Sequence, residues 1–89
     1  MLRITPTDDG TQYVNLLLEG RVAGPWVAEL RRVCDNLLAE GRPLRLDLTG
    51  VSFLEADGIE TLTSLRSRGV VLTNCSPFVS ELLKSAAAN

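Results

Sequence analysis

Hydrophobic and polar positions alternate most strictly in the middle of the chain. Apolar side chains there are separated by polar ones, with Leu44, Leu46 and Leu48 in the first set and Arg45, Asp47 and Thr49 in the second. A period of two residues predicts a β-strand over 44–48 that is buried on one face. An apolar corner over 51–54 is expected to follow, before a turn at 55–58 that begins a helix.

The helix after this turn is predicted from about Gly58 to Arg68. Asp57 is expected to be its N-cap, because a carboxylate at that position accepts a hydrogen bond from the first free N–H groups. Glu60, three residues later, would complete a capping box. The start of this helix is the predicted functional surface, since it presents unpaired N–H groups and the positive end of the helix dipole.

Two apolar runs precede the alternating strand, at 2–5 and 13–18, and turn-forming residues at 7–10 separate them. This arrangement predicts a β-hairpin. A loop over 20–24 is expected next, followed by a helix over 25–40. Proline at the first helical position and glycine just after the last one favour these helix bounds.

The buried face of this first helix is predicted from apolar residues three and four positions apart. These residues are Val27, Leu30, Cys34, Leu37 and Leu38. Trp26 lies beside this face, and we expect it to be buried although a lone tryptophan is also a candidate interface residue.

The last part of the chain predicts one more strand, at 70–74, and a third helix that Ser76 caps and Pro77 begins. The order strand, strand, helix, strand, helix, strand, helix predicts right-handed crossovers between parallel strands. Polar residues alternate along 44–49, so we expect helices mainly on one face of the sheet. The prediction is an α/β fold with a four-stranded mixed sheet, in which the N-terminal strand is antiparallel and the other three are parallel.

Composition narrows the class of protein. The chain has 89 residues, of which 45% are hydrophobic and 22% charged, and its net charge is −2. These values predict one small globular domain and give no electrostatic reason to expect nucleic-acid binding. No stretch approaches the about 20 apolar residues that span a bilayer, and the N-terminus lacks the apolar region of a secretory signal. We therefore expect a cytoplasmic protein without direct membrane insertion.

Residues suited to catalysis or metal binding are scarce. The chain has no histidine and two cysteines, Cys34 and Cys75, which do not form a CxxC motif. A thiolate zinc site needs about four ligands, so reduced thiols that pack as small apolar groups are expected instead. Helix capping explains the spacing of Asp57 and Glu60, and no residue has the context of a nucleophile. We expect no enzyme activity, no metal and no cofactor.

Several segments together resemble the STAS domain, the fold of bacterial anti-sigma factor antagonists and of domains appended to sulfate transporters. The resemblance extends from about Leu2 to Leu83, and its specific parts are the residues 48–54, the acidic-x-x-Gly turn 55–58 and residues 74–77. It implies a single domain over the 89 residues. STAS domains commonly continue with another strand and a longer C-terminal helix. Without them the last strand is an open edge, and a homodimer through that edge or the third helix is a hypothesis.

The resemblance also implies a role for the turn. In antagonists of this family the turn usually reads Asp-Ser-Ser/Thr-Gly, and a partner kinase that is also the anti-sigma factor phosphorylates the first serine to switch binding off. Matching the turn places Glu55 at the acidic residue, Ala56 at the phosphoacceptor, Asp57 at the next hydroxyl and Gly58 at the glycine. Ala56 has no hydroxyl, so this switch cannot operate at that position, and the chain resembles the unphosphorylated state that binds its partner.

By resemblance, this is a non-enzymatic regulatory domain that binds a kinase-type anti-sigma factor through Glu55, Ala56, Asp57, Gly58 and Arg21. One alternative is a STAS-like subunit that binds the ATPase of a lipid-transport ABC system. Another is a module that senses a nucleotide or lipid at the helix start, although the two carboxylates would repel an anionic ligand.

These candidate residues also have structural interpretations. Glu55 is either a binding charge or a solvated turn residue, and Asp57 is expected to cap the helix in addition to any contact. Gly58 is expected to permit either a close approach or an unusual backbone angle. Phe53 is expected in the core, and Arg21 at the rim of the binding surface.

Overall fold

The computed structural model describes residues 1–7, 10 and 12–87. The elements follow one another as β1 (Leu2–Thr7), β2 (Val14–Val22), α1 (Pro25–Ala39), β3 (Leu44–Leu54), α2 (Ala56–Ser67), β4 (Val71–Thr73) and α3 (Pro77–Ala87). This order is the predicted one. The turn expected between the first two strands includes Asp8 and Asp9, which lie outside the described residues.

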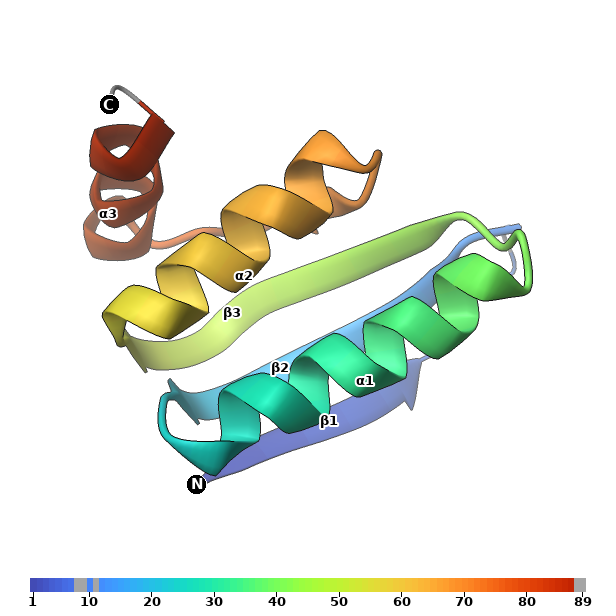
Figure 1. The fold of residues 1–89 in the computed structure, drawn as a ribbon, viewed down its shortest axis with the longest axis horizontal. Coiled ribbons are helices and arrows are strands. Elements are labelled where there is room, and N and C mark those ends of the chain that lie inside the picture. The colour runs from blue at the N-terminus through green and yellow to red at the C-terminus, as the bar shows by residue number, and fades with distance from the viewer. Residues whose placement is uncertain (8–9, 11, 88–89) are drawn as a thin grey trace.

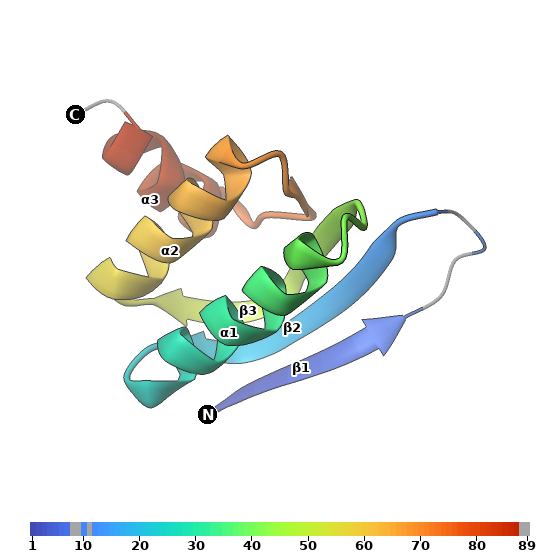
Figure 2. The same cartoon turned by 45° about the vertical axis from the view of Figure 1, so that its right-hand side comes forward.

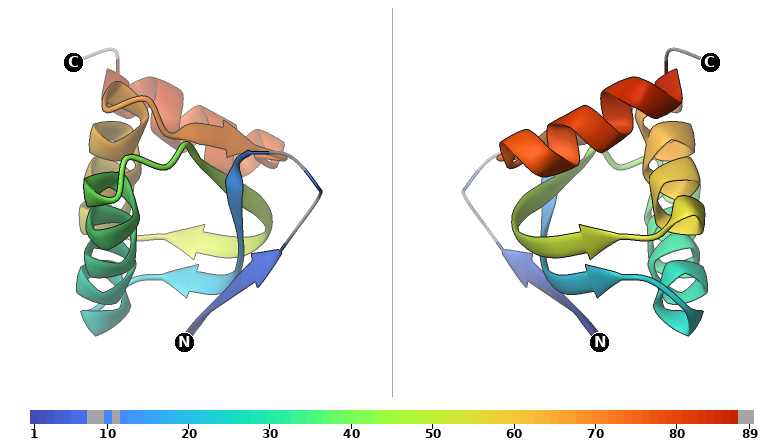
Figure 3. Two further views of the ribbon diagram at one scale, coloured as in Figure 1. Left: turned by 90° about the vertical axis from the view of Figure 1, so that its right-hand side faces the viewer. Right: turned by 90° about the vertical axis from the view of Figure 1, so that its left-hand side faces the viewer.

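The strands form one sheet in the order β1-β2-β3-β4, with α1 and α2 on the same face (Figures 1 and 3). β1 pairs antiparallel with β2, and β3 pairs parallel with β2 and with β4. Both helices are on one face because each right-handed crossover moves in the same direction across the sheet. α3 packs against α2 and β3 (Figure 2). The predicted mixed sheet and its one-sided helical cover are confirmed.

The two central strands are longer than predicted. β2 continues to Val22, so residues 20–22 are strand rather than loop, and β3 continues to Leu54, so the expected corner is also strand. Two register shifts keep β2 and β3 paired along this added length, as β-bulges do. β4, in contrast, is limited to Val71–Thr73. As a consequence, β2 and β3 both lead almost directly into a helix.

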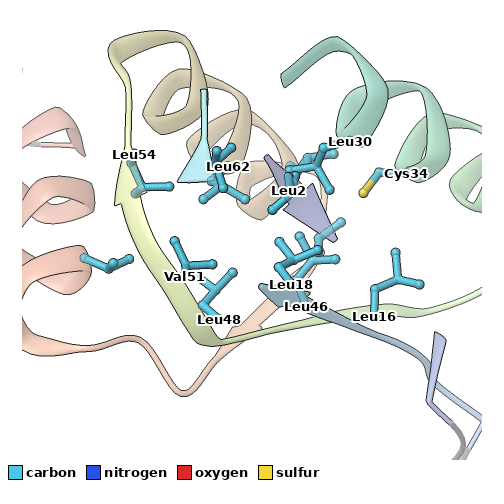
Figure 4. Packing of buried hydrophobic residues seen from close by; sticks show 14 of the residues in the cluster. Leu2, Leu16, Leu18, Leu30, Cys34, Leu46, Leu48, Val51, Leu54 and Leu62 are labelled. Atoms are coloured by element: carbon cyan, nitrogen blue, oxygen red, sulfur yellow. The ribbon is translucent and has the colours of Figure 1, made fainter. Parts of the chain in front are cut away.

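The core lies between the sheet and the helices α1 and α2, and Val79 and Leu83 of α3 also belong to it (Figure 4). Its central leucines are fully buried and come from both layers: Leu18, Leu30, Leu46, Leu48 and Leu62. Burial of each such side chain stabilises the fold by about 1.5–3 kcal/mol. No helix in the described ranges is both long enough and apolar enough to cross a bilayer.

The predicted buried face of α1 is confirmed, with Val27, Leu30 and Cys34 buried and Leu37 and Leu38 packed against the core. Burial raises the pKa of the Cys34 thiol to about 12, which keeps it protonated and unreactive at neutral pH.

The expectation for Trp26 is wrong, because 36% of this side chain is exposed. Trp26 lies beside Leu2 and Ile4, in a shallow groove between the start of α1 and β1. β1 is an edge strand, so within the described part of the chain no further strand lies beyond it to cover the indole. An edge position therefore explains the exposure.

Candidate functional site

The candidate site lies where β2 and β3 end and where α1 and α2 begin. The last residue pairs of the two strands are Arg21 with Phe53 and Val22 with Leu54. Two residues connect β2 to α1, and Glu55 alone connects β3 to α2. The carboxyl ends of parallel strands are the common ligand-binding edge of α/β sheets. The structure thus brings Arg21 to the same end of the sheet as the turn residues 55–58.

Glu55 connects the starts of the two helices. Its backbone N–H donates to the Val22 carbonyl at 3.0 Å, and its carboxylate Oε2 accepts a hydrogen bond from the Gly24 N–H at 3.1 Å. Its own carbonyl accepts the first hydrogen bond of α2, from the Ile59 N–H at 2.9 Å. The exposed carboxylate therefore has a positioning role, which a simple solvated turn residue does not have.

Asp57 is not the N-cap of α2, and this prediction is wrong. The cap residue is Glu55, and among the described residues no side chain accepts a hydrogen bond from the first turn. The helix begins at Ala56 because β3 extends to Leu54 and leaves a single connecting residue. Asp57 is thus within the first turn, where its charge interacts favourably with the helix dipole. The expected capping box with Glu60 does not form.

Gly58 is required by a close approach, which is the first of the two predicted alternatives. A Cβ atom at this position would lie 2.6 Å from the Val22 carbonyl oxygen and 2.9 Å from Val22 Cγ1. These atoms belong to β2, so the first turn of α2 packs directly on the end of that strand. Only glycine fits without displacing one of them.

Arg21 is exposed, and its guanidinium carbon lies 4.8 Å from the centre of the Phe53 ring. This cation–π contact holds the arginine over the neighbouring strand. Phe53 is half-buried, so the predicted core position is only partly correct. The pair places one positive charge at the same end of the sheet as Glu55 and Asp57.

A groove between α2 and α3, which we call the α2–α3 groove, begins at the candidate turn. Its described lining residues come from one face of α2 and from α3: Ala56, Ile59, Glu60, Thr63, Ser64, Ser67, Leu82 and Ser85. Sequence reasoning missed this groove, because it depends on where α3 packs. The available signal was the run of small and polar residues three and four positions apart along α2.

The described residues of the candidate site form no metal-binding cluster. Across residues 1–7, 10 and 12–87, no three His, Cys, Asp or Glu residues come close enough to hold a metal ion.

The side chain of Ala56 is exposed at the first position of α2, at the end of the α2–α3 groove. The arrangement is suited to contact with another molecule along an exposed surface.

No protein-family model and no curated protein sequence matches the chain. Solved structures do match. The anti-sigma factor antagonist SpoIIAA, in its unphosphorylated form, aligns with a TM-score of 0.72 and 16% identity over 92% of this chain and 82% of its own. An anti-sigma factor antagonist from Mycobacterium paratuberculosis aligns with a TM-score of 0.83 and 16% identity, over 99% and 80% of the two chains.

A third match, to the structure named Mglu, has a TM-score of 0.63 and 17% identity, and it covers 79% of this chain but 19% of the other. The two matches to antagonists extend over at least 92% of this chain and at least 80% of the antagonist chains. The protein therefore has the STAS-like fold that is shared with anti-sigma factor antagonists.

Proposed function

We propose that this protein is a non-enzymatic regulatory domain of the anti-sigma factor antagonist type, which acts in the cytoplasm by binding a kinase-type anti-sigma factor. The observation that carries the proposal is the fold match to an antagonist over 99% of the chain. The exposed turn 55–58 supports it, since by resemblance this turn has the position of the partner-binding turn. The partner would contact Glu55, Ala56, Asp57 and Arg21, with Gly58 shaping the surface beneath them.

In this proposal, phosphorylation at position 56 does not control binding. Ala56 presents an exposed methyl group where the family's antagonists carry a phosphorylated serine. A phosphate would add a charge of about −1.5 to −2 beside two existing carboxylates. Its absence supports a domain that stays competent to bind, so that the amount of protein would set the level of regulation.

The geometry of the turn also supports a preformed binding surface. The hydrogen bond between Glu55 and Gly24 and the contact between Gly58 and Val22 fix the starts of α1 and α2 relative to each other. A surface that is already ordered loses little conformational entropy when a partner binds.

A direct test is to measure binding of each kinase-type anti-sigma factor from the same organism by isothermal titration calorimetry. Asp57→Lys is the informative variant, because Asp57 is exposed and does not cap the helix. We expect binding to weaken at least about ten-fold, since reversing a charge in an interface creates repulsion. The matched control is Glu40→Lys, at the far end of α1, which should bind within about two-fold of the wild type.

Two outcomes would contradict the proposal: binding to none of these factors, or equal binding by wild type and Asp57→Lys. A complex with a transport ATPase instead would retain the surface but assign it to the ABC-system alternative.

Homodimer formation through β4 or α3 is a further proposal. β4 is an edge strand, and Val71 on it is 37% exposed. Sedimentation velocity at increasing concentration tests it, with Val71→Lys as the variant, because a charged edge strand resists pairing. A dimer that Val71→Lys converts to a monomer would support the edge contact, and a monomer at all concentrations would contradict it.

A further inference from the structure

We propose that the α2–α3 groove binds an amphipathic α-helix of the protein partner, and that a lysine or arginine of this helix pairs with Glu60. The inference rests on the proposed function, because it takes the partner to be a protein that docks at the start of α2. It adds which surface receives the partner and what structural element the partner inserts.

The dimensions of the groove fit a helix. Its α2 wall runs from Ala56 to Ser67, which at 1.5 Å per residue is a length of about 17 Å, or three turns of a docked helix. Three serines and one alanine lie among its lining residues, and small side chains permit a short distance between helix axes. Both walls are helices, whose main-chain groups bond within each helix. An extended peptide would find no strand edge there to pair with.

The floor of the groove offers both apolar and polar contacts. Ile59 and Leu82 are half-buried and line it from opposite helices. Thr63 also lines the groove, one turn after Ile59 on α2, and its Oγ1 is buried without a hydrogen-bond partner among the described residues. A buried hydroxyl without a partner is costly, so a polar side chain that bonds to it would stabilise the complex. The groove thus favours a helix with apolar residues and at least one polar residue on the same face.

The negative charges at and near the α2–α3 groove favour a partner helix that carries lysine or arginine. Among the described residues that line the α2–α3 groove, Glu60 is the only charged one, and no ion pair joins it to another described residue. Glu55 and Asp57 add two more carboxylates at the same end of α2. The hollow on the far side of α3 instead carries Arg66 and Lys84. A cationic side chain near Glu60 would therefore be attracted to this groove and repelled from that hollow.

The α2–α3 groove is continuous with the turn 55–58, which is the proposed partner surface. Ala56 belongs both to the turn 55–58 and to the lining of the groove. A single partner that covers the turn would therefore also cover the first part of the groove. The two surfaces together give a contact longer than the turn alone.

A display library of helical peptides tests the inference without any knowledge of the partner. The probe is an alanine-based helix of 18 residues with the positions of one face randomised, selected on the 89-residue protein. We expect enrichment of peptides with apolar residues at helical spacing and a lysine or arginine at one end. No enrichment, or enrichment of acidic peptides, would overturn the inference.

Variants then locate the binding site of the selected peptides, measured by fluorescence anisotropy. Ser64→Arg fills the middle of the groove and should weaken binding at least about ten-fold. Ser80→Arg introduces the same side chain at an exposed serine of α3 outside the groove, and should leave binding unchanged. Equal effects of the two variants would overturn the groove assignment. Thermal unfolding of both variants checks that each remains folded.

A charge exchange tests the pairing with Glu60. Glu60→Lys should weaken binding of the basic peptide, and a peptide with its basic residue changed to glutamate should bind this variant better than the wild type. Loss of binding without this rescue would contradict the ion pair. Because the peptides replace the partner, the result is independent of the calorimetry. Failure of the anti-sigma factors to bind would refute the proposed function, whereas failure of the selection would refute the groove.

Discussion

The helices α1 and α2 begin side by side at the same end of the sheet. Their N-cap N–H groups, however, donate hydrogen bonds to different kinds of acceptor. At the start of α1, the Gly24 N–H is bonded by the Glu55 carboxylate, and Pro25 has no N–H to satisfy. At the start of α2, the Glu55 N–H donates to the backbone carbonyl of Val22 instead, and among the described residues neither helix has a side-chain cap. The acidic residue at the α2 N-cap therefore serves the neighbouring helix and not its own.

The difference lies in the first helical residues and in the kind of acceptor that each N-cap N–H finds. Both N-cap N–H groups are bonded within the chain, but α1 begins with Pro25, which has no N–H, whereas α2 begins with Ala56 and Asp57, which are exposed and keep their N–H groups uncapped by side chains. An uncapped helix start costs about 1 kcal/mol relative to a capped one.

The largest predicted effect comes from a substitution that disrupts the contact of Gly58 with Val22, which positions α2. Gly58→Ala would gain about 1 kcal/mol in helix propensity, but its Cβ would overlap with Val22. Overpacking of this kind costs about 1–3 kcal/mol, and the overlap here involves backbone, so we expect a net loss of about 2 kcal/mol. Urea unfolding at neutral pH measures it. Ser67→Ala, on the exposed last turn of α2, is the control and should stay within about 0.5 kcal/mol.

The next effect removes the bond that distinguishes the two helix starts. Glu55→Ala should lose about 1 kcal/mol of stability, because the Gly24 N–H loses its acceptor. Glu55→Gln retains an amide oxygen that can accept the same bond, so it should lose less than half as much. Identical losses in the two variants, again by urea unfolding, would show that charge and not the hydrogen bond is the source of the stability.

A smaller effect concerns the charge in the first turn of α2. Asp57→Asn should lower stability by about 0.3–0.5 kcal/mol in dilute buffer, since a carboxylate there interacts with the helix dipole. In 1 M salt the difference should disappear, because screening shortens the range of the interaction to about 3 Å. The same variant should weaken partner binding much more than it weakens folding. A loss of stability that salt does not change would indicate a contact beyond the dipole.

The smallest effect is a pH dependence that arises away from both helix starts. Hydrogen bonds from the side chain and backbone of Thr49 and from Asn74 hold the pKa of Asp47 below its usual value of 3.8. Its folded-state pKa is lowered, so its contribution to stability is present above pH 3.8 and is lost as the pH falls through the folded value. Urea unfolding at pH 7 and pH 3 should show less acid sensitivity in Asp47→Asn than in the wild type. If Asp47→Asn and the wild type are equally sensitive to acid, other carboxylates cause the loss of stability.

Local patterns in the sequence predicted most of the fold. The alternation at 44–48, the apolar spacing on α1 and the Ser76-Pro77 start of α3 each depend on residues close in sequence. The Ser76 hydroxyl accepts a hydrogen bond from the Val79 N–H at 3.1 Å, as expected of a cap. Such signals are visible without knowledge of tertiary packing.

The site was predicted less well, because its details depend on packing between distant segments. The bulged pairing of β2 with β3 extends both strands, so that α2 begins at Ala56 and Asp57 cannot cap it. The bond from Gly24 to Glu55 joins residues 31 positions apart. Gly58 was predicted to permit either a close approach or an unusual backbone angle, but its neighbour Val22 could not be identified, since no local pattern relates the two. The location of the α2–α3 groove depends on α3 in the same way.

The parallel pairing of β2 with β3 has a consequence for how the site forms during folding. Paired residues such as Val14 and Leu44, or Val22 and Leu54, are about thirty positions apart, and the crossover must close before they meet. Contacts of this kind form late and slow the folding of a small domain. The turn 55–58 takes its final shape only beside Val22, so a partner would bind the native chain and not a partly folded one. In hydrogen exchange, such a partner would then slow global unfolding and protect amides throughout the core, well beyond the surface that it covers.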